Sequence, residues 1–548
     1  MNAGGPRAVL ATADGRAIER SRASLSSAGW TMVSRGTGLL RAATVAAVLG
    51  ATYLGNTYQA LLVLPNFAFG LITGALFGSL LVPSLVERLD RGDRHGAEEL
   101  AGAFLGLLLV GAAMLTALTI AAGDAVLALL SVTVDDPALA AAQRDAGWLL
   151  LVTLMPQLLL YVIAATASAV LTAHGRFAVA AAAPALENAG IIVTLAAAAM
   201  LFATGTEVAE VPRGELLLLG LGTTAAVALH AGVVWWYAAR VGLRIRPRAG
   251  WRAPAVRGVL GLLRPSLAYT VLETVPLWLV IVVANGVPGG VVVFWLAFNF
   301  VQLPLAIGAR PIATTFLPAL SRLRHGGALA AFRDELGTAL RLASFVTIPS
   351  AVAFVVLARP FGDAIAVARL AEAPDAVEML ALALAGMAIG LVGRATFVIL
   401  TDAAYALGDA VSPVLANGVR ATLVVAGVLV ATALEGGVAV VLTLALAVAA
   451  GDVAGAGYLR RRLRRGLPAG GAAAGSLWRT VLSALVMAIP AAGLAFGLSA
   501  TIGEVPAIAA ASIVGIVVYL ALQKRLGAPE LEFFSRGVAS FMPSRRIA

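Results

Sequence analysis

Several charged side chains of this chain lie within long apolar segments, where a charge is costly. Two acids and five arginines stand out: Glu187, Glu273, Arg35, Arg41, Arg310, Arg394 and Arg420. A charged residue in membrane hydrocarbon usually faces a partner or a water-filled cavity, so each is a candidate functional residue. Because a guanidinium group binds phosphate through parallel hydrogen bonds and keeps its charge, the arginines suit a pyrophosphate-bearing ligand. A buried glutamate can gain or lose a proton, which makes Glu187 and Glu273 candidates for coupling to a cation gradient.

Each of these charges can instead be one half of an ion pair between helices, and the sequence leaves both interpretations open. Arg41 sits ~16 Å inside its segment if the helix begins near Trp30, because a helix rises ~1.5 Å per residue. That depth is too great for easy snorkelling to the cytoplasmic surface. Arg35 is shallower, so snorkelling and a cavity role are both open. We interpret His230 as a packed or interfacial histidine.

Long apolar segments carry these residues. Hydrophobic residues make up 60% of the 548-residue chain, charged residues make up 12%, and the mean hydropathy is +0.94. A transmembrane helix needs ~20 mainly apolar residues, and continuous apolar runs argue against a β-barrel. We therefore predict an all-α polytopic membrane protein with fourteen helix cores, at 29–51, 57–85, 99–123, 146–173, 176–203, 214–239, 258–285, 290–320, 336–358, 376–400, 410–433, 436–458, 475–498 and 502–523.

Arginine gathers in every second connection between these segments. The basic stretches are the N-terminal tail and residues 88–94, 240–257, 322–333 and 460–465, whereas the intervening loops are acidic or poor in arginine. By the positive-inside rule, both termini are cytoplasmic. Topology and anionic lipid headgroups account for the net charge of +10, so no nucleic-acid partner is expected.

The residue types leave little room for other chemistry. The chain has no cysteine and four histidines, which excludes thiol catalysis and disulfides and leaves little for a metal site. No nucleophile and base stand at a recognisable spacing. We expect no catalytic residues, no metal and no cofactor beyond coupling to a cation gradient or the membrane potential.

An internal repeat organises the chain. Leu64-Pro65 in helix two has a counterpart in Leu303-Pro304 of helix eight, and Pro184 with Asn188 in helix five has one in Pro413 with Asn417 of helix eleven. Two matches in the same order predict two parallel six-helix lobes with a cavity between them. The predicted parts are a disordered cytoplasmic tail at 1–28, an N-lobe at 29–240, a basic linker at 241–257, a C-lobe at 258–460, a basic loop at 461–474, two further helices at 475–523 and a cytoplasmic tail at 524–548.

Short motifs along residues 29–460 resemble the MurJ/MviN family of lipid II flippases. They are Ser34-Arg35-Gly36-Thr37-Gly38-Leu39-Leu40-Arg41, Leu64-Pro65-Asn66, Gly74-Ala75-Leu76-Phe77, Val82-Pro83-Ser84-Leu85, Gly175-Arg176-Phe177 and Phe316-Leu317-Pro318-Ala319-Leu320. The resemblance implies fourteen helices and a V-shaped cavity between two lobes. It also implies movement of an undecaprenyl-pyrophosphate-linked peptidoglycan precursor from the inner to the outer leaflet.

The chain departs from the family pattern at several charged positions. The basic pair that the family usually has after the helix-two proline is Phe69-Gly70 here, and the acid before the next glycine is replaced by Gly74. Only Arg35 and Arg41 carry over from the family's arginines, and Arg310 is a candidate substitute in helix eight. The resemblance thus implies a substrate-binding set of Arg35, Arg41, Arg310, Asn299 and Asn56, the two asparagines standing where the family has charges.

Three classes of function compete. The resemblance favours a flippase for a lipid-linked precursor. A cation-coupled exporter of small molecules, or of another lipid-linked glycan, is the first alternative. A transport-inactive scaffold for envelope synthesis is the second alternative, and the loss of the family's charged residues favours it. The expected partners are a lipid-linked anionic substrate, membrane lipids and cell-wall synthesis proteins, and the expected location is the cytoplasmic membrane.

Overall fold

The structure, a computed structural model, describes residues 29–73, 81–202, 207–249, 254–468 and 474–534. The predicted tail at 1–28, the motif Gly74-Ala75-Leu76-Phe77 and most of the last predicted tail lie outside the described residues. Within the described ranges the regular structure is helical and contains no strand. The predicted all-α fold is confirmed.

The chain divides into two compact units, Met1–Val271 and Leu272–Ala548, and the boundary falls inside α10 (Pro254–Ala284). The first unit holds the helix at residues 29–49, then α2 (Tyr53–Thr73), α3 (Val82–Asp90), α4 (Arg94–Ala121), α5 (Gly123–Leu130), α6 (Pro137–Leu154), α7 (Gln157–Ala173), α8 (Phe177–Leu201) and α9 (Arg213–Arg240). The second holds α11 (Gly290–Pro304), η2 (Leu305–Ala309), α12 (Arg310–His325), α13 (Leu329–Val356), α14 (Ala358–Ile365), η3 (Ala368–Leu370), α15 (Pro374–Ala406), α16 (Val411–Ala431), α17 (Gly437–Gly466), α18 (Ala474–Ile502) and α19 (Glu504–Arg525).

Local chemistry explains where the predicted boundaries were wrong. The helix expected from residue 146 begins at Pro137, because the Asp136 carboxylate accepts a hydrogen bond from the backbone N–H of Ala138 at 2.8 Å and caps it. A proline at the first helical position suits that start. The helix expected over 290–320 contains the π-helical turn η2 directly after Pro304, because proline has no N–H to continue the helical ladder.

Twelve helical segments of the described residues are long and apolar enough to cross a membrane. The two predicted spans that fall short are the helix at 29–49 and α2. The first carries Arg35 and Arg41, and the second carries Asn56 and Asn66 among other polar residues. These polar side chains lower the apolarity of both helices, and the described part of α2 ends at Thr73, short of the predicted core at 57–85.

Each unit repeats the same local design. The eight-residue helix α5 follows α4 and packs on α6, and the eight-residue helix α14 follows α13 and packs on α15. Glycines with positive φ close equivalent turns: Gly92 (+76°) and Gly327 (+71°) precede α4 and α13, and Gly175 (+72°) and Gly408 (+81°) precede α8 and α16. Glycine adopts this conformation without a steric penalty, which allows the chain to reverse direction between these helices.

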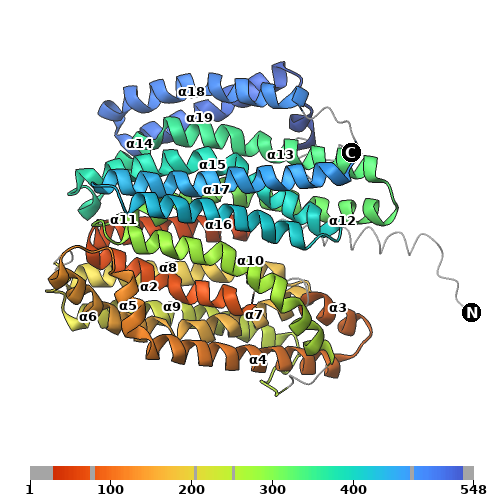
Figure 1. The fold of residues 1–548 in the computed structure, drawn as a ribbon, viewed down its shortest axis with the longest axis horizontal. Helices are drawn as coiled ribbons and strands as arrows, with labels where there is room; N and C mark the ends of the chain where they lie inside the picture. Colours follow the sequence, from red (N-terminus) through yellow and green to blue (C-terminus); the bar gives the residue numbers. More distant parts are fainter. Residues whose placement is uncertain (1–28, 74–80, 203–206, 250–253, 469–473, 535–548) are drawn as a thin grey trace, which may run out of the picture. The chain divides into compact units, whose positions relative to one another are not determined.

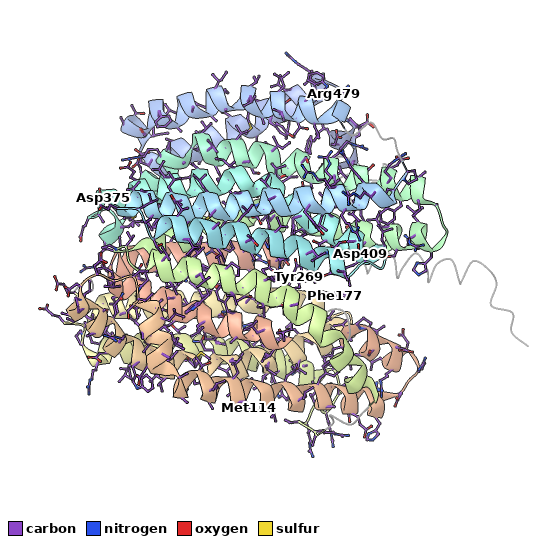
Figure 2. The ribbon with its side chains drawn as sticks, in the orientation of Figure 1. Met114, Phe177, Tyr269, Asp375, Asp409 and Arg479 are labelled. Atoms are coloured by element: carbon purple, nitrogen blue, oxygen red, sulfur yellow. The ribbon has the colours of Figure 1, made fainter. Side chains whose placement is uncertain are left out.

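In the second unit, α15 and α17 form the most extensively packed pair, and α16 packs on α17 (Figure 1). Small residues allow the close approach of α15 and α17. A Cβ atom built on Gly390 would lie 2.5 Å from the Cα atom of Ala449, and one built on Gly393 would lie 2.8 Å from the Cα atom of Val453. Figure 2 shows Asp375 and Asp409 at opposite ends of this helix layer, at the two ends of α15.

Asp409 closes the turn between α15 and α16. Its carboxylate accepts hydrogen bonds from the backbone N–H groups of Val411 (3.1 Å) and Ser412 (2.9 Å) and from the Ser412 hydroxyl (2.5 Å). Burial raises the pKa of Asp409, but these hydrogen bonds outweigh it and hold the pKa below its usual value. The carboxylate thus caps the start of α16 in its charged form.

We expect Gly390→Ala to destabilise the second unit, because the new methyl group must displace the α17 backbone. Overpacking of this kind typically costs about 1–3 kcal/mol. Gly457→Ala on α17 is the matched control, since a Cβ atom there meets nothing within 4 Å. Heating the purified protein in detergent and following its loss from the monodisperse peak should show a lower Tm for Gly390→Ala alone. Equal Tm values for the two variants would contradict the close packing.

Candidate functional site

A buried polar network lies among α2, α7, α8 and α9 of the first unit. The Glu187 carboxylate of α8 sits 2.8 Å from Nδ1 of His230 on α9, and it accepts a hydrogen bond from the Tyr161 hydroxyl of α7 at 3.1 Å. Asn66 of α2 donates to the same hydroxyl at 3.2 Å. The side chains of Glu187 and His230 are each 10% exposed. Four helices thus converge on one titratable pair.

Nearby side chains on the same helices make further hydrogen bonds between them. Asn188, next to Glu187, donates hydrogen bonds to the backbone oxygen of Ser34 and to the Thr37 hydroxyl, both at 3.2 Å. These contacts tie α8 to the helix at 29–49. The hydroxyls of Tyr58 and Thr223 are 2.7 Å apart and join α2 to α9. The network is therefore held on rigid helices rather than on loops.

Arg41 lies beside this network. It is half-buried on the helix at 29–49, and its charge acts on the hydroxyls of Tyr58 and Tyr161. Arg35 lies less than two turns earlier on the same helix and is exposed. Asn56, the third predicted binding residue of this unit, is 0% exposed in the first turn of α2. Of the three, Arg41 is the residue that the structure brings next to other functional candidates.

A charged cluster occupies the second unit, where α10, α15, α16 and α17 contribute one residue each. Arg394 of α15 is 2.6 Å from Glu273 of α10 and 3.7 Å from Asp452 of α17. Asp452 also pairs with Arg420 of α16 at 2.7 Å. Two guanidinium and two carboxylate groups make the cluster formally neutral. It borders a pocket whose remaining walls are mainly apolar side chains of α10, α11, α15, α16 and α17.

The other two predicted binding residues of this unit differ in their surroundings. Arg310 is exposed in the first turn of α12, and its charge acts on Glu273 and Asp402. Asn299 donates a hydrogen bond to the backbone oxygen of Trp295 on its own helix at 2.7 Å. Arg310 is therefore near the charged cluster, whereas the amide of Asn299 bonds locally. Within the described residues no group of three or more histidines and acids is placed to hold a metal ion.

Sequence reasoning missed several members of these two groups. Asp452 and Asp402 are acids inside apolar helices, so the cost of a membrane-buried charge would have identified them as it identified Glu273. Tyr161 gave no comparable signal, because a tyrosine in an apolar helix is common. Among the alternatives left open, the structure places Glu273 in an interhelical ion pair and gives Glu187 a histidine and a tyrosine as partners.

Comparison with known proteins places the chain in a family. A family model described as lipid II flippase MurJ matches residues 45–515. The probable lipid II flippase MurJ of Vibrio cholerae is 26% identical over 390 residues, which cover 70% of this chain and 72% of that protein. The probable lipid II flippase MurJ of Rhizobium meliloti is 28% identical over 338 residues, which cover 61% of this chain and 60% of that protein.

Solved structures share the fold. A lipid II flippase MurJ in an inward closed conformation has a TM-score of 0.69 at 17% identity, over 93% of this chain and 98% of that chain. An inward-facing MATE-family multidrug resistance transporter of the MOP superfamily has a TM-score of 0.61 at 16% identity, over 78% of this chain and 95% of that chain. With a matching family model across most of its length and the helical fold of the family, this chain is a multi-pass inner-membrane protein that belongs to the lipid II flippase MurJ family.

Proposed function

We propose that this chain moves an undecaprenyl-pyrophosphate-linked peptidoglycan precursor, lipid II, across the cytoplasmic membrane by alternating access. The observation that carries the proposal is the family match over residues 45–515. The repeated helical design of the two units supports it, because transporters with parallel repeats commonly work by movement of one half against the other. Both termini are cytoplasmic in this proposal, in accord with the arginine-rich connections.

Arg41, Arg35 and Arg310 are the proposed binding groups for the pyrophosphate. Arg41 is the principal one, because it is half-buried, carries a permanent charge and lies beside the polar network of the first unit. Asn56 and Asn299 take minor parts, since one is fully buried and the other bonds within its helix. Membrane lipids surround the protein, and cell-wall synthesis proteins are its proposed protein partners.

A transporter of this kind needs an energy source that distinguishes its states. Moving one charge across 100 mV is worth about 2.3 kcal/mol, so the membrane potential can bias a carrier of an anionic headgroup. We assign coupling to the membrane potential or a cation gradient. Glu273 has a structural part in this proposal, because Arg394 is a permanent cation that keeps it paired. Glu187 is then the coupling candidate.

Expression of this chain should restore growth to cells depleted of their own lipid II flippase. The readout is colony formation after depletion, with membrane-inserted protein verified in the same cells. If the protein inserts but the cells lyse, the cargo is another molecule or the chain is a scaffold. Accumulation of a different lipid-linked glycan on the inner leaflet of the native host after deletion would then identify an exporter.

Arg41→Ala should lower lipid II translocation by roughly ten- to a hundredfold, because charge-assisted hydrogen bonds are worth about 1.5–3 kcal/mol. Arg41→Lys should retain part of the activity, since an ammonium group lacks the two-pronged geometry. Arg144→Ala is the matched control in the same unit, because Arg144 is exposed and bonds to its own helix. Wild-type translocation by Arg41→Ala would remove this residue from the mechanism.

Asp452→Asn should destabilise the second unit by roughly 3–5 kcal/mol, because it leaves two largely buried guanidinium groups without their shared carboxylate. Glu273→Gln should cost less, since the Glu273 side chain is 37% exposed and solvent screens its charge. Thermal unfolding in detergent measures both. The double variant Asp452→Asn with Arg420→Gln should recover part of the loss, and no recovery would mean that the pair does not carry the effect.

A further inference from the structure

The two coupling candidates, Glu187 and Glu273, differ in whether their partners can change charge. Glu273 pairs with Arg394, and a guanidinium group does not lose its proton in proteins. Glu187 pairs with His230, and imidazole is the side chain whose charge ordinarily changes between pH 5 and 8. The Glu273 cluster therefore has a fixed charge, whereas the Glu187–His230 pair can exist in two charge states.

The hydrogen bonds define where an added proton goes. One carboxylate oxygen of Glu187 faces Nδ1 of His230 at 2.8 Å, and the other accepts from the Tyr161 hydroxyl at 3.1 Å. With Glu187 ionised, Nδ1 carries the hydrogen that bonds to the carboxylate, so Nε2 is the basic nitrogen. A proton added at Nε2 makes an imidazolium whose charge is balanced by Glu187.

The helices around the pair contribute several polar and charged groups. The helix at 29–49 contributes Arg41, α7 contributes Tyr161, and α2 contributes Tyr58, whose hydroxyl is 2.7 Å from that of Thr223. The acids and bases of α6, which packs on α9, are Arg144 and Asp145, and both are exposed. Arg41 is a permanent charge that acts on Tyr161, the hydroxyl partner of Glu187.

We propose that the Glu187–His230 pair is a proton site linked to anion binding at Arg41, which rests on the proposed role of Arg41 in binding pyrophosphate. Without the added proton, Glu187 balances the charge of Arg41. With the proton on Nε2, Glu187 balances the imidazolium and the Arg41 charge is left to an anion. By thermodynamic reciprocity, an anion at Arg41 strengthens proton binding by the factor by which the proton strengthens anion binding.

Asn188, the residue after Glu187 in α8, connects this site to the helix that carries Arg41. Asn188 follows Glu187 and holds the helix at 29–49 through Ser34 and Thr37. A change in how Glu187 is held therefore acts on the same turn of α8 that anchors that helix. The turn of α8 that carries Glu187 and Asn188 therefore takes part both in proton binding and in positioning the helix that carries Arg41.

Histidine-selective ¹⁵N labelling of the purified protein in nanodiscs tests the proton site directly, because the chain has four histidines. His230→Gln assigns the His230 resonances. They should change with pH, and Glu187→Gln should move the midpoint to lower pH, because an opposite charge in contact is lost. Tyr161→Phe should move it upward, because the carboxylate loses a donor. His174→Gln is the control and should leave it unchanged.

Inorganic pyrophosphate is the probe for the linkage. At a fixed pH near the midpoint, adding it should shift the His230 signal toward the protonated form, and Arg41→Ala should abolish that shift at equal ionic strength. A His230 signal that stays constant from pH 5 to 8 would overturn the proton site. A pyrophosphate effect that survives in Arg41→Ala would overturn the linkage. A protein that passes both tests but does not rescue flippase-depleted cells loses the proposed cargo and keeps the proton site.

Discussion

Charges within an apolar helical bundle must be balanced by partners, and this constraint shapes both units of the protein. An uncompensated charge in a low-dielectric interior costs several kcal/mol even after relaxation, so each intramembrane acid needs a donor or a cation. Glu273 and Asp452 meet the requirement with Arg394 and Arg420. Glu187 meets it with His230 and Tyr161.

The two units use one helical design for different chemistry. Both have a short helix after the third long span and a glycine turn before the fifth. In the second unit, four formal charges cancel and bind helices α10, α15, α16 and α17 together. In the first unit, the corresponding interior holds groups that can gain or lose a proton. Under our proposal for Glu187 and His230, the first unit responds to protons, whereas ion pairs hold the second.

The fold was largely predictable from the sequence because hydropathy and arginine placement report directly on the membrane. Each of the fourteen predicted cores overlaps helices in the described residues. Boundaries were less predictable: the Asp136 cap and the π-helical turn after Pro304 depend on local hydrogen bonds that periodicity does not register. The first two helices were predicted from their apolar runs like the other twelve, although they carry more polar side chains.

The candidate site was predictable only in part. The cost of burying charge singled out Arg41, Glu187, Glu273, Arg394 and Arg420, but it does not say which of them meet. The partnership of Glu187 with His230 joins residues 43 positions apart in sequence, and it depends on how α8 packs on α9. Neutral members such as Tyr161 and Asn66 carry no charge penalty, so they became visible only through their hydrogen bonds.

Lipid II translocation by this chain can be measured directly. The direct test is the rate at which lipid II added to the inner leaflet of proteoliposomes becomes accessible to an impermeant probe on the outside. We expect the purified protein to accelerate this rate over protein-free liposomes under an inside-negative potential, and Arg41→Ala to return it close to the protein-free rate. Equal rates with and without the wild-type protein, in vesicles where it is folded and inserted, would show that this chain does not translocate lipid II.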